Sequence, residues 1–223
     1  MKKLLSTLLA FLLCASMLVT GAAAFEFEIL DPNKVFSDEL KEQLSTSSWA
    51  REELKKAEIA GLITENTTFY KTHSITRFQF AELIANATQI ITGKEIAPAP
   101  EGTFTDCGEA VVLKAYAAGI VNGMGDDTFE PDTTTNREQI ATMIARAVSY
   151  IEKETGKTYL TQPSSFEKFA DKGDVSDWAA EAMGLLAANS IMNGTSDTEL
   201  SPKSPCTIEQ SILLVYRFYA KTV

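Results

Sequence analysis

One pattern occurs three times in this 223-residue chain: a polar helix start followed by a helical stripe of apolar residues. Each start has Thr or Asn followed three residues later by Gln, which is the signature of a capping box. A second apolar helix pattern precedes each copy, so the repeated unit is a helix pair. The three starts are Thr76-Arg77-Phe78-Gln79, Asn136-Arg137-Glu138-Gln139 and Thr207-Ile208-Glu209-Gln210.

The copies align with offsets of 60 and 71 residues, and their apolar residues then coincide at i, i+3, i+4 and i+7, one face of a helix. The first helices also align, ending at Gly61, Gly119 and Ser190. We expect them to open, or nearly open, 12 residues earlier, on Trp49, Cys107 and Trp178. The sequence therefore predicts an all-α fold of three helix-loop-helix repeats.

The first 24 residues have the features of a signal peptide: a basic start, an apolar stretch and small residues at the end. We expect a secreted protein with no membrane span after cleavage, because no later segment has 18 uninterrupted apolar residues. We also expect no separate cargo domain. The predicted organisation is 1–24 signal peptide, 25–44 N-terminal lead-in, 45–96 first repeat, 97–160 second repeat and 161–223 third repeat.

Charge and residue counts exclude several kinds of function. Without Lys2 and Lys3, 18 basic residues face 30 acidic ones, a net charge of −12. Such a chain repels nucleic acid, so any anion must bind in a local pocket. The single histidine, His73, argues against His-based triads and multi-His metal sites. We predict no catalytic residues, no metal site and no cofactor.

Two cysteines, Cys107 and Cys206, remain after the signal peptide, and they can form one disulfide outside the cell. They replace a Trp and an Ile at packing positions, which favours free or partly buried thiols instead.

The loop inside the second repeat contains Gly123 and Gly125, and its Phe129 is expected to fold back into the core, as is Leu200 in the third repeat. The first repeat is two residues shorter here and lacks the glycines.

Arg77 and Arg137 are not explained by capping, because the helix dipole disfavours a cation at the first helical position. Free backbone N–H groups together with a guanidinium make a small anion site suited to a carboxylate or phosphate. Two simpler roles stay open, a solvated surface arginine and a pair with an acid of a neighbouring repeat. The third repeat has Ile208 here.

Trp49 and Trp178 also have two interpretations. A tryptophan at the start of an amphipathic helix usually packs at least part of its ring in the core, and it can equally form a flat wall for a sugar ring.

The ordered set of features resembles the S-layer homology (SLH) family. It comprises aromatic-x-Asp entries such as Phe36-Ser37-Asp38 and Phe104-Thr105-Asp106, Trp-Ala at helix one, the glycine-rich loop, and Ile75-Thr76-Arg77 at helix two. The resemblance covers residue 36 to the C-terminus.

This resemblance implies a pseudo-threefold spindle of three repeats, attached non-covalently to an anionic, often pyruvylated, secondary polysaccharide of a bacterial cell wall. It implies that Arg77 and Arg137 meet the carboxylate in grooves between repeats, that Gly123 and Gly125 let the backbone approach the sugar, and that Trp49 and Trp178 are the matching aromatics. Other surface-layer proteins are further possible partners. Ile208, Cys107 and Asn136 depart from the pattern, so we expect one or two competent grooves and a mainly structural third repeat.

Two other functions are compatible with the sequence. A surface protein–protein adaptor would use degenerate grooves and bind no polymer. A hydrolase would need paired carboxylates in different environments, whereas acids such as Glu52 and Glu53 are expected on solvated helix faces.

Overall fold

The computed structural model describes residues 44–223, and this part of the chain contains six α-helices. The predicted signal peptide and the Phe36-Ser37-Asp38 entry lie outside the described residues. The first helices of the pairs are α4 (Arg51–Ile59), α6 (Ala110–Ala117) and α8 (Asp177–Ala188), and the second helices are α5 (Arg77–Thr92), α7 (Arg137–Thr155) and α9 (Ile208–Tyr219). Two short 3-10 helices, η1 (Glu65–Thr67) and η2 (Lys172–Asp174), lie in the connections. The predicted all-α fold is confirmed.

All three capping boxes are present. In α5, the Thr76 hydroxyl accepts from the Gln79 N–H at 3.2 Å, and the Gln79 Oε1 accepts from the Thr76 N–H at 3.0 Å. Asn136 with Gln139 and Thr207 with Gln210 repeat this exchange. Because the caps satisfy backbone donors that a helix start leaves unpaired, they fix where each second helix begins.

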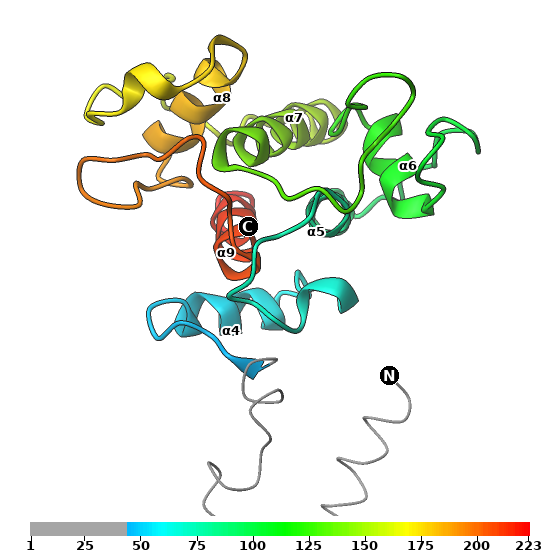
Figure 1. Ribbon diagram of the computed structural model, residues 1–223, viewed down its shortest axis with the longest axis horizontal. Helices are drawn as coiled ribbons and strands as arrows, with labels where there is room; N and C mark the ends of the chain where they lie inside the picture. Colours follow the sequence, from blue (N-terminus) through cyan, green and yellow to red (C-terminus); the bar gives the residue numbers. More distant parts are fainter. Residues whose placement is uncertain (1–43) are drawn as a thin grey trace, which may run out of the picture. The chain divides into compact units, whose positions relative to one another are not determined.

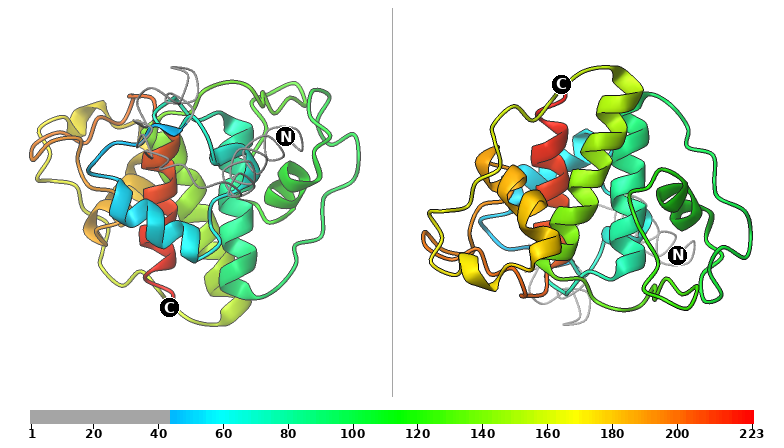
Figure 2. Two further views of the ribbon diagram at one scale, coloured as in Figure 1. Left: turned by 90° about the horizontal axis from the view of Figure 1, so that it is seen from below. Right: turned by 90° about the horizontal axis from the view of Figure 1, so that it is seen from above.

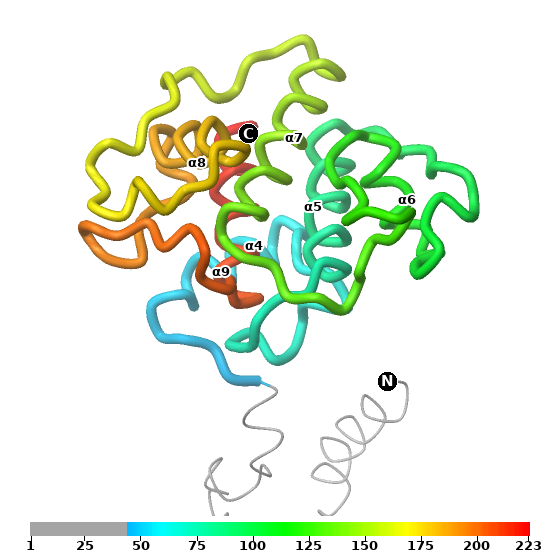
Figure 3. The backbone as a smooth tube through the Cα atoms, turned by 45° about the horizontal axis from the view of Figure 1, so that its top comes forward, coloured from blue at the N-terminus to red at the C-terminus, as the bar shows by residue number. Residues whose placement is uncertain are grey.

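The second helices α5, α7 and α9 run side by side, and the first helices lie outside them (Figures 1 and 2). Each first helix packs mainly against a second helix from a different pair: α6 on α5, α8 on α7, and α4 on α9. Figure 3 shows α6 beside α5 and α8 beside α7. The contact between α4 and α9 joins the first and third repeats, so the three pairs interlock in a closed, pseudo-threefold arrangement.

A closed ring of three backbone hydrogen bonds joins the repeats at the helix starts. Ile75 N–H donates to the Cys206 carbonyl at 2.9 Å, Cys206 N–H to the Thr135 carbonyl at 3.1 Å, and Thr135 N–H to the Ile75 carbonyl at 3.1 Å. All three residues are fully buried. Each repeat therefore donates one hydrogen bond and accepts one, and the ring holds the second helices in register.

The buried face of each helix agrees with the sequence stripes. The aligned residues from Phe80 to Ala87 in α5 and from Ile140 to Ala147 in α7 are buried, and Phe129 and Leu200 fold back into the core as predicted. No helix within residues 44–223 is both long and apolar enough to cross a membrane.

The first helices begin within three residues of the predicted positions. Helix α8 starts one residue before Trp178, and α4 starts two residues after Trp49. Helix α6 starts at Ala110, because the extended backbone of Glu109 sets the boundary and leaves Cys107 outside the helix. Cys107 and Cys206 are free and buried, which confirms the predicted thiols. Burial raises the pKa of the Cys206 thiol.

Candidate binding grooves

Two hollows between the repeats are lined by residues at matching repeat positions. We call them the Trp178 groove and the Trp49 groove; their volumes are about 270 and 420 Å³. Each combines residues from all three repeats: an arginine that starts one second helix, an Asn-Gly loop, an arginine on the next second helix, and a tryptophan. The Trp178 groove has Arg77, Asn122, Gly123, Gln139, Arg146 and Trp178, and the Trp49 groove has Arg137, Asn193, Gly194, Gln210, Arg217 and Trp49.

Arg77 and Arg137 are buried and reach into the loop of the following repeat. Arg77 Nε donates to the Phe129 carbonyl at 2.9 Å, and its Nη2 donates to the Asn122 carbonyl at 3.1 Å. Arg137 repeats both bonds, to Leu200 at 2.8 Å and to Asn193 at 2.7 Å. Neither simple role considered for these arginines is correct, because both side chains are buried and neither forms an ion pair with a carboxylate within residues 44–223. Burial lowers the pKa of both guanidinium groups.

The prediction that free backbone N–H groups at the helix starts contribute to an anion site is wrong. The Arg77 and Phe78 N–H groups donate to the Thr133 and Pro131 carbonyls, both at 2.9 Å, and α7 and α9 make the equivalent bonds to their neighbours. The cap side chain takes the third N–H. Sequence could not show this, because the acceptors belong to the next repeat. Any anion bound here must therefore be held by groups other than the backbone N–H groups of these helix starts.

The Asn-Gly loop closes one side of each groove. A Cβ on Gly123 would lie 2.9 Å from the Thr128 carbonyl oxygen, and a Cβ on Gly194 would lie 2.5 Å from that of Glu199. Only glycine fits there, so these loops keep a backbone surface toward the groove. Gly125, proposed with Gly123, takes a left-handed φ of 120° and is outside the groove lining. Gly194 was not singled out from the sequence.

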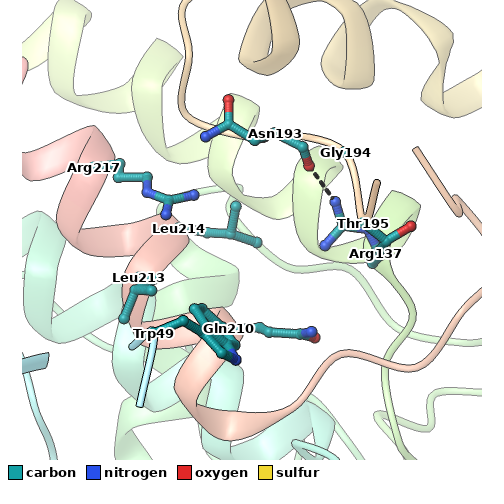
Figure 4. Close-up of a pocket in the computed structure, with 9 residues that line it drawn as sticks. All are labelled: Trp49, Arg137, Asn193, Gly194, Thr195, Gln210, Leu213, Leu214 and Arg217. Atoms are coloured by element: carbon teal, nitrogen blue, oxygen red, sulfur yellow. Dashed lines mark hydrogen bonds between the residues drawn. The ribbon is translucent and has the colours of Figure 1, made fainter. Parts of the chain in front are cut away.

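The tryptophans are more exposed than a mainly packing role requires. Trp49 is 57% exposed and Trp178 is 58% exposed, and both line their grooves. Figure 4 shows Trp49 beside Gln210, with Arg137 and Arg217 on opposite sides of Leu214. Each groove therefore offers an open aromatic face near two guanidinium groups.

A buried glutamate positions the segment that precedes each tryptophan. Glu138 Oε2 accepts from the Ser176 N–H at 3.1 Å, just before Trp178, and its Oε1 accepts from Lys203 at 2.6 Å. Glu209 accepts from the Ser47 N–H at 3.0 Å and from its hydroxyl at 2.6 Å, just before Trp49. These glutamates therefore hold the backbone next to Trp178 and Trp49 in place, and with it the positions of the two indole rings.

Glu138→Ala is expected to lower the free energy of unfolding by about 1–3 kcal/mol, because the Ser176 N–H and Lys203 lose their acceptor. Chemical denaturation would measure this. Glu181→Ala is the matched control: Glu181 is exposed on α8, and its loss should cost less than about 0.5 kcal/mol. Equal effects of the two variants would contradict the positioning role of Glu138.

The third junction between repeats lacks these groups. Ile208 stands in place of the arginine at the helix start, Asn86 in place of Arg146, and Cys107 in place of the tryptophan. Ile208 and Cys107 are buried. The sequence predicted a mainly structural third repeat; this repeat nevertheless contributes Trp178 to the lining of one groove and Asn193, Gly194 and Arg217 to the lining of the other.

Of the two carboxylates expected on solvated helix faces, one lies as expected and the other does not. Glu52 is exposed and pairs with Lys56, as a solvated face predicts. Glu53 instead receives two hydrogen bonds from Arg217, from Nε at 2.9 Å and from Nη2 at 2.6 Å. Sequence analysis also missed Arg146 and Arg217, although they are separated by the same 71-residue offset as the repeats.

Comparison with known proteins gives the same assignment as the repeats. Residues 106–141 and 168–207 match the S-layer homology domain. An endoglucanase of Bacillus sp. (strain KSM-635) is 30% identical over 216 residues, which is 96% of this chain and 22% of that enzyme. The exoglucanase XynX of Acetivibrio thermocellus is 27% identical over 70% of this chain and 14% of its own length. An amylopullulanase of Thermoanaerobacterium thermosulfurigenes is 25% identical over 90% of this chain and 10% of its own length.

The chain thus spans less than a quarter of each of these relatives. S-layer homology domains are non-catalytic modules that bind cell-wall polymers in bacteria, so the match supports cell-wall anchoring. The matched segments include the start of α7 with Arg137, the two glycine-rich loops and Trp178. The two matched segments are therefore S-layer homology repeats, and the three helix pairs arranged around a closed ring are consistent with a tandem array of such repeats.

Proposed function

We propose that this protein is exported and held on the bacterial cell surface by binding an anionic, for example pyruvylated, secondary cell-wall polysaccharide in the Trp178 and Trp49 grooves. One observation carries the proposal: an exposed tryptophan and two arginines line the same hollow, and this combination occurs twice. A charged sugar needs both elements, an apolar wall for its ring and a cation for its acid.

The geometry supports a division of labour within each groove. The two hydrogen bonds from Arg77 to loop carbonyls fix the guanidinium plane, and its Cζ lies 4.8 Å from the Phe129 ring centroid. Its Nη1 has no hydrogen-bond partner among residues 44–223 and is available to an incoming carboxylate. A preorganised guanidinium loses little freedom on binding, which favours affinity.

The overall charge is consistent with a local site. The chain carries a net charge of −10, so a polyanion is repelled at long range and attracted only inside the grooves. The relatives are named as polysaccharide-degrading enzymes, and this chain matches only 10% to 22% of their lengths. An attachment module shared with such enzymes fits this partial match.

Trp178→Ala and Trp49→Ala test the proposal without disturbing the core. Each truncation is expected to weaken binding at its own groove by about 30-fold, because a tryptophan at the centre of a site typically contributes about 2 kcal/mol or more. Titration calorimetry with purified wall polymer would measure the loss. Ile59→Ala is the control, because Ile59 is 78% exposed on α4 and lies outside both grooves. Unchanged affinity in both tryptophan variants would contradict the proposed grooves.

A further inference from the structure

The two grooves are built from equivalent residues, but a carboxylate distinguishes them. Arg146 on α7 and Arg217 on α9 occupy the same repeat position. Arg217 is engaged by Glu53 through two hydrogen bonds, and both side chains are only 26% and 30% exposed. Arg146 forms no ion pair with any of residues 44–223. Its Nη2 lies 3.3 Å from the side-chain oxygen of Asn122 when that amide is oriented to satisfy both of its neighbours.

The difference follows from the first helices. Glu53 stands four residues after Trp49, one helical turn further along the chain, and so reaches the groove that Trp49 lines. The residue four after Trp178 is Ala182, which has no charge and is buried. Substitution at a single repeat position therefore places an acid at one groove and leaves the other without it.

This changes what each groove offers an anion. In the Trp178 groove, both Arg77 and Arg146 can turn donors toward a ligand. In the Trp49 groove, Arg137 remains available, whereas a ligand must compete with Glu53 for the planar fork of Arg217. Bidentate arginine–carboxylate pairs are strong and geometrically specific, and a fixed acid beside a site also repels a second anion.

We infer that Glu53 determines the specificity of the two grooves. The Trp178 groove takes the polymer unit that carries two anionic groups, such as a carboxylate together with a phosphate or a second carboxylate. The Trp49 groove takes a unit with one anionic group and holds it more weakly. This inference rests on the proposed function, since it concerns how the same two grooves divide the same polymer.

The test isolates each groove and then changes its second arginine. In the Trp49→Ala protein, where binding depends on the Trp178 groove, Arg146→Gln is expected to weaken binding of purified polymer about tenfold. In the Trp178→Ala protein, the charge-neutral exchange of Glu53→Gln together with Arg217→Gln is expected to change affinity less than about threefold, because these two side chains already neutralise each other in the unmodified protein. Titration calorimetry at two salt concentrations would also show a steeper salt dependence for the Trp178 groove.

Glu53→Gln supplies the opposite prediction. In the Trp178→Ala protein it should raise the affinity of the Trp49 groove about fivefold to tenfold by releasing Arg217. Equal losses from Arg146→Gln and from the Glu53→Gln, Arg217→Gln pair, with no gain from Glu53→Gln alone, would overturn the inference and leave the proposed function intact. Failure of the unmodified protein to bind the polymer at all would instead reject the proposed function. Denaturation curves for every variant keep losses of folding separate from losses of binding.

Discussion

The combined variant Arg77→Ala with Arg137→Ala is expected to lose binding to wall polymer by about 100-fold or more, because both grooves lose the guanidinium that starts the second helix. The same change should lower the free energy of unfolding by about 2–4 kcal/mol. It leaves the carbonyls of Phe129, Asn122, Leu200 and Asn193 without these donors, and unpaired buried acceptors are costly. Titration calorimetry and chemical denaturation measure the two effects separately.

The matched single lysine variants Arg77→Lys and Arg137→Lys separate charge from geometry. Lysine keeps the positive charge but cannot reproduce the planar fork that bonds to two carbonyls. We therefore expect these variants to retain part of the polymer binding while losing stability. A double alanine variant that remains folded and binds the polymer within twofold of the unmodified protein would show that these arginines only clamp the loops.

Ile75→Ala is expected to lower the free energy of unfolding by about 2–5 kcal/mol. Ile75 is fully buried, and its backbone both donates and accepts in the ring that joins the three helix starts. The cavity would open at the junction of all three repeats, where the surrounding backbone is fixed by the ring and cannot collapse around it. Chemical denaturation would measure the loss, and a loss below about 1 kcal/mol would contradict the central role of the ring.

Thr135 is the counterpart of Ile75 in the second repeat, and Thr135→Val should raise the free energy of unfolding instead of lowering it. The Thr135 hydroxyl is buried and has no hydrogen-bond partner among residues 44–223, whereas its counterparts are Ile75 and Cys206. Valine has a similar shape and removes the unsatisfied group, so the unfolding free energy should rise by about 1 kcal/mol. The pair of variants distinguishes packing at the ring from a general sensitivity of this region to substitution.

Much of this fold could be predicted from local sequence patterns. The capping boxes and apolar stripes depend on residues within a few positions of one another, which is why the second helices begin where the Thr or Asn caps indicate. Helix α6 begins three residues after Cys107, whereas α4 and α8 begin within two residues of their tryptophans. Repeat alignment finds equivalent positions, but the first helices have no side-chain cap that would fix the residue at which each begins.

The site was harder to predict because its contacts cross between repeats. The arginines at the helix starts were identified, yet their acceptors are carbonyls of the following loop, and no side-chain pattern marks a carbonyl. Glu53 was assigned to a solvated face because its partner, Arg217, is 164 residues away. Arg146 and Arg217 recur at the repeat offset, but an alignment on the apolar positions does not mark them as site residues.

Co-sedimentation of the purified protein with cell-wall sacculi of its own organism tests the central claim most directly. Sacculi would be used intact and after chemical removal of the attached secondary polymer, with the Trp49→Ala, Trp178→Ala double variant alongside. Cell-wall anchoring through the two grooves predicts that the unmodified protein sediments only with polymer-bearing sacculi, and that the folded double variant stays in solution. Equal sedimentation of both proteins, or binding that survives removal of the polymer, would contradict it.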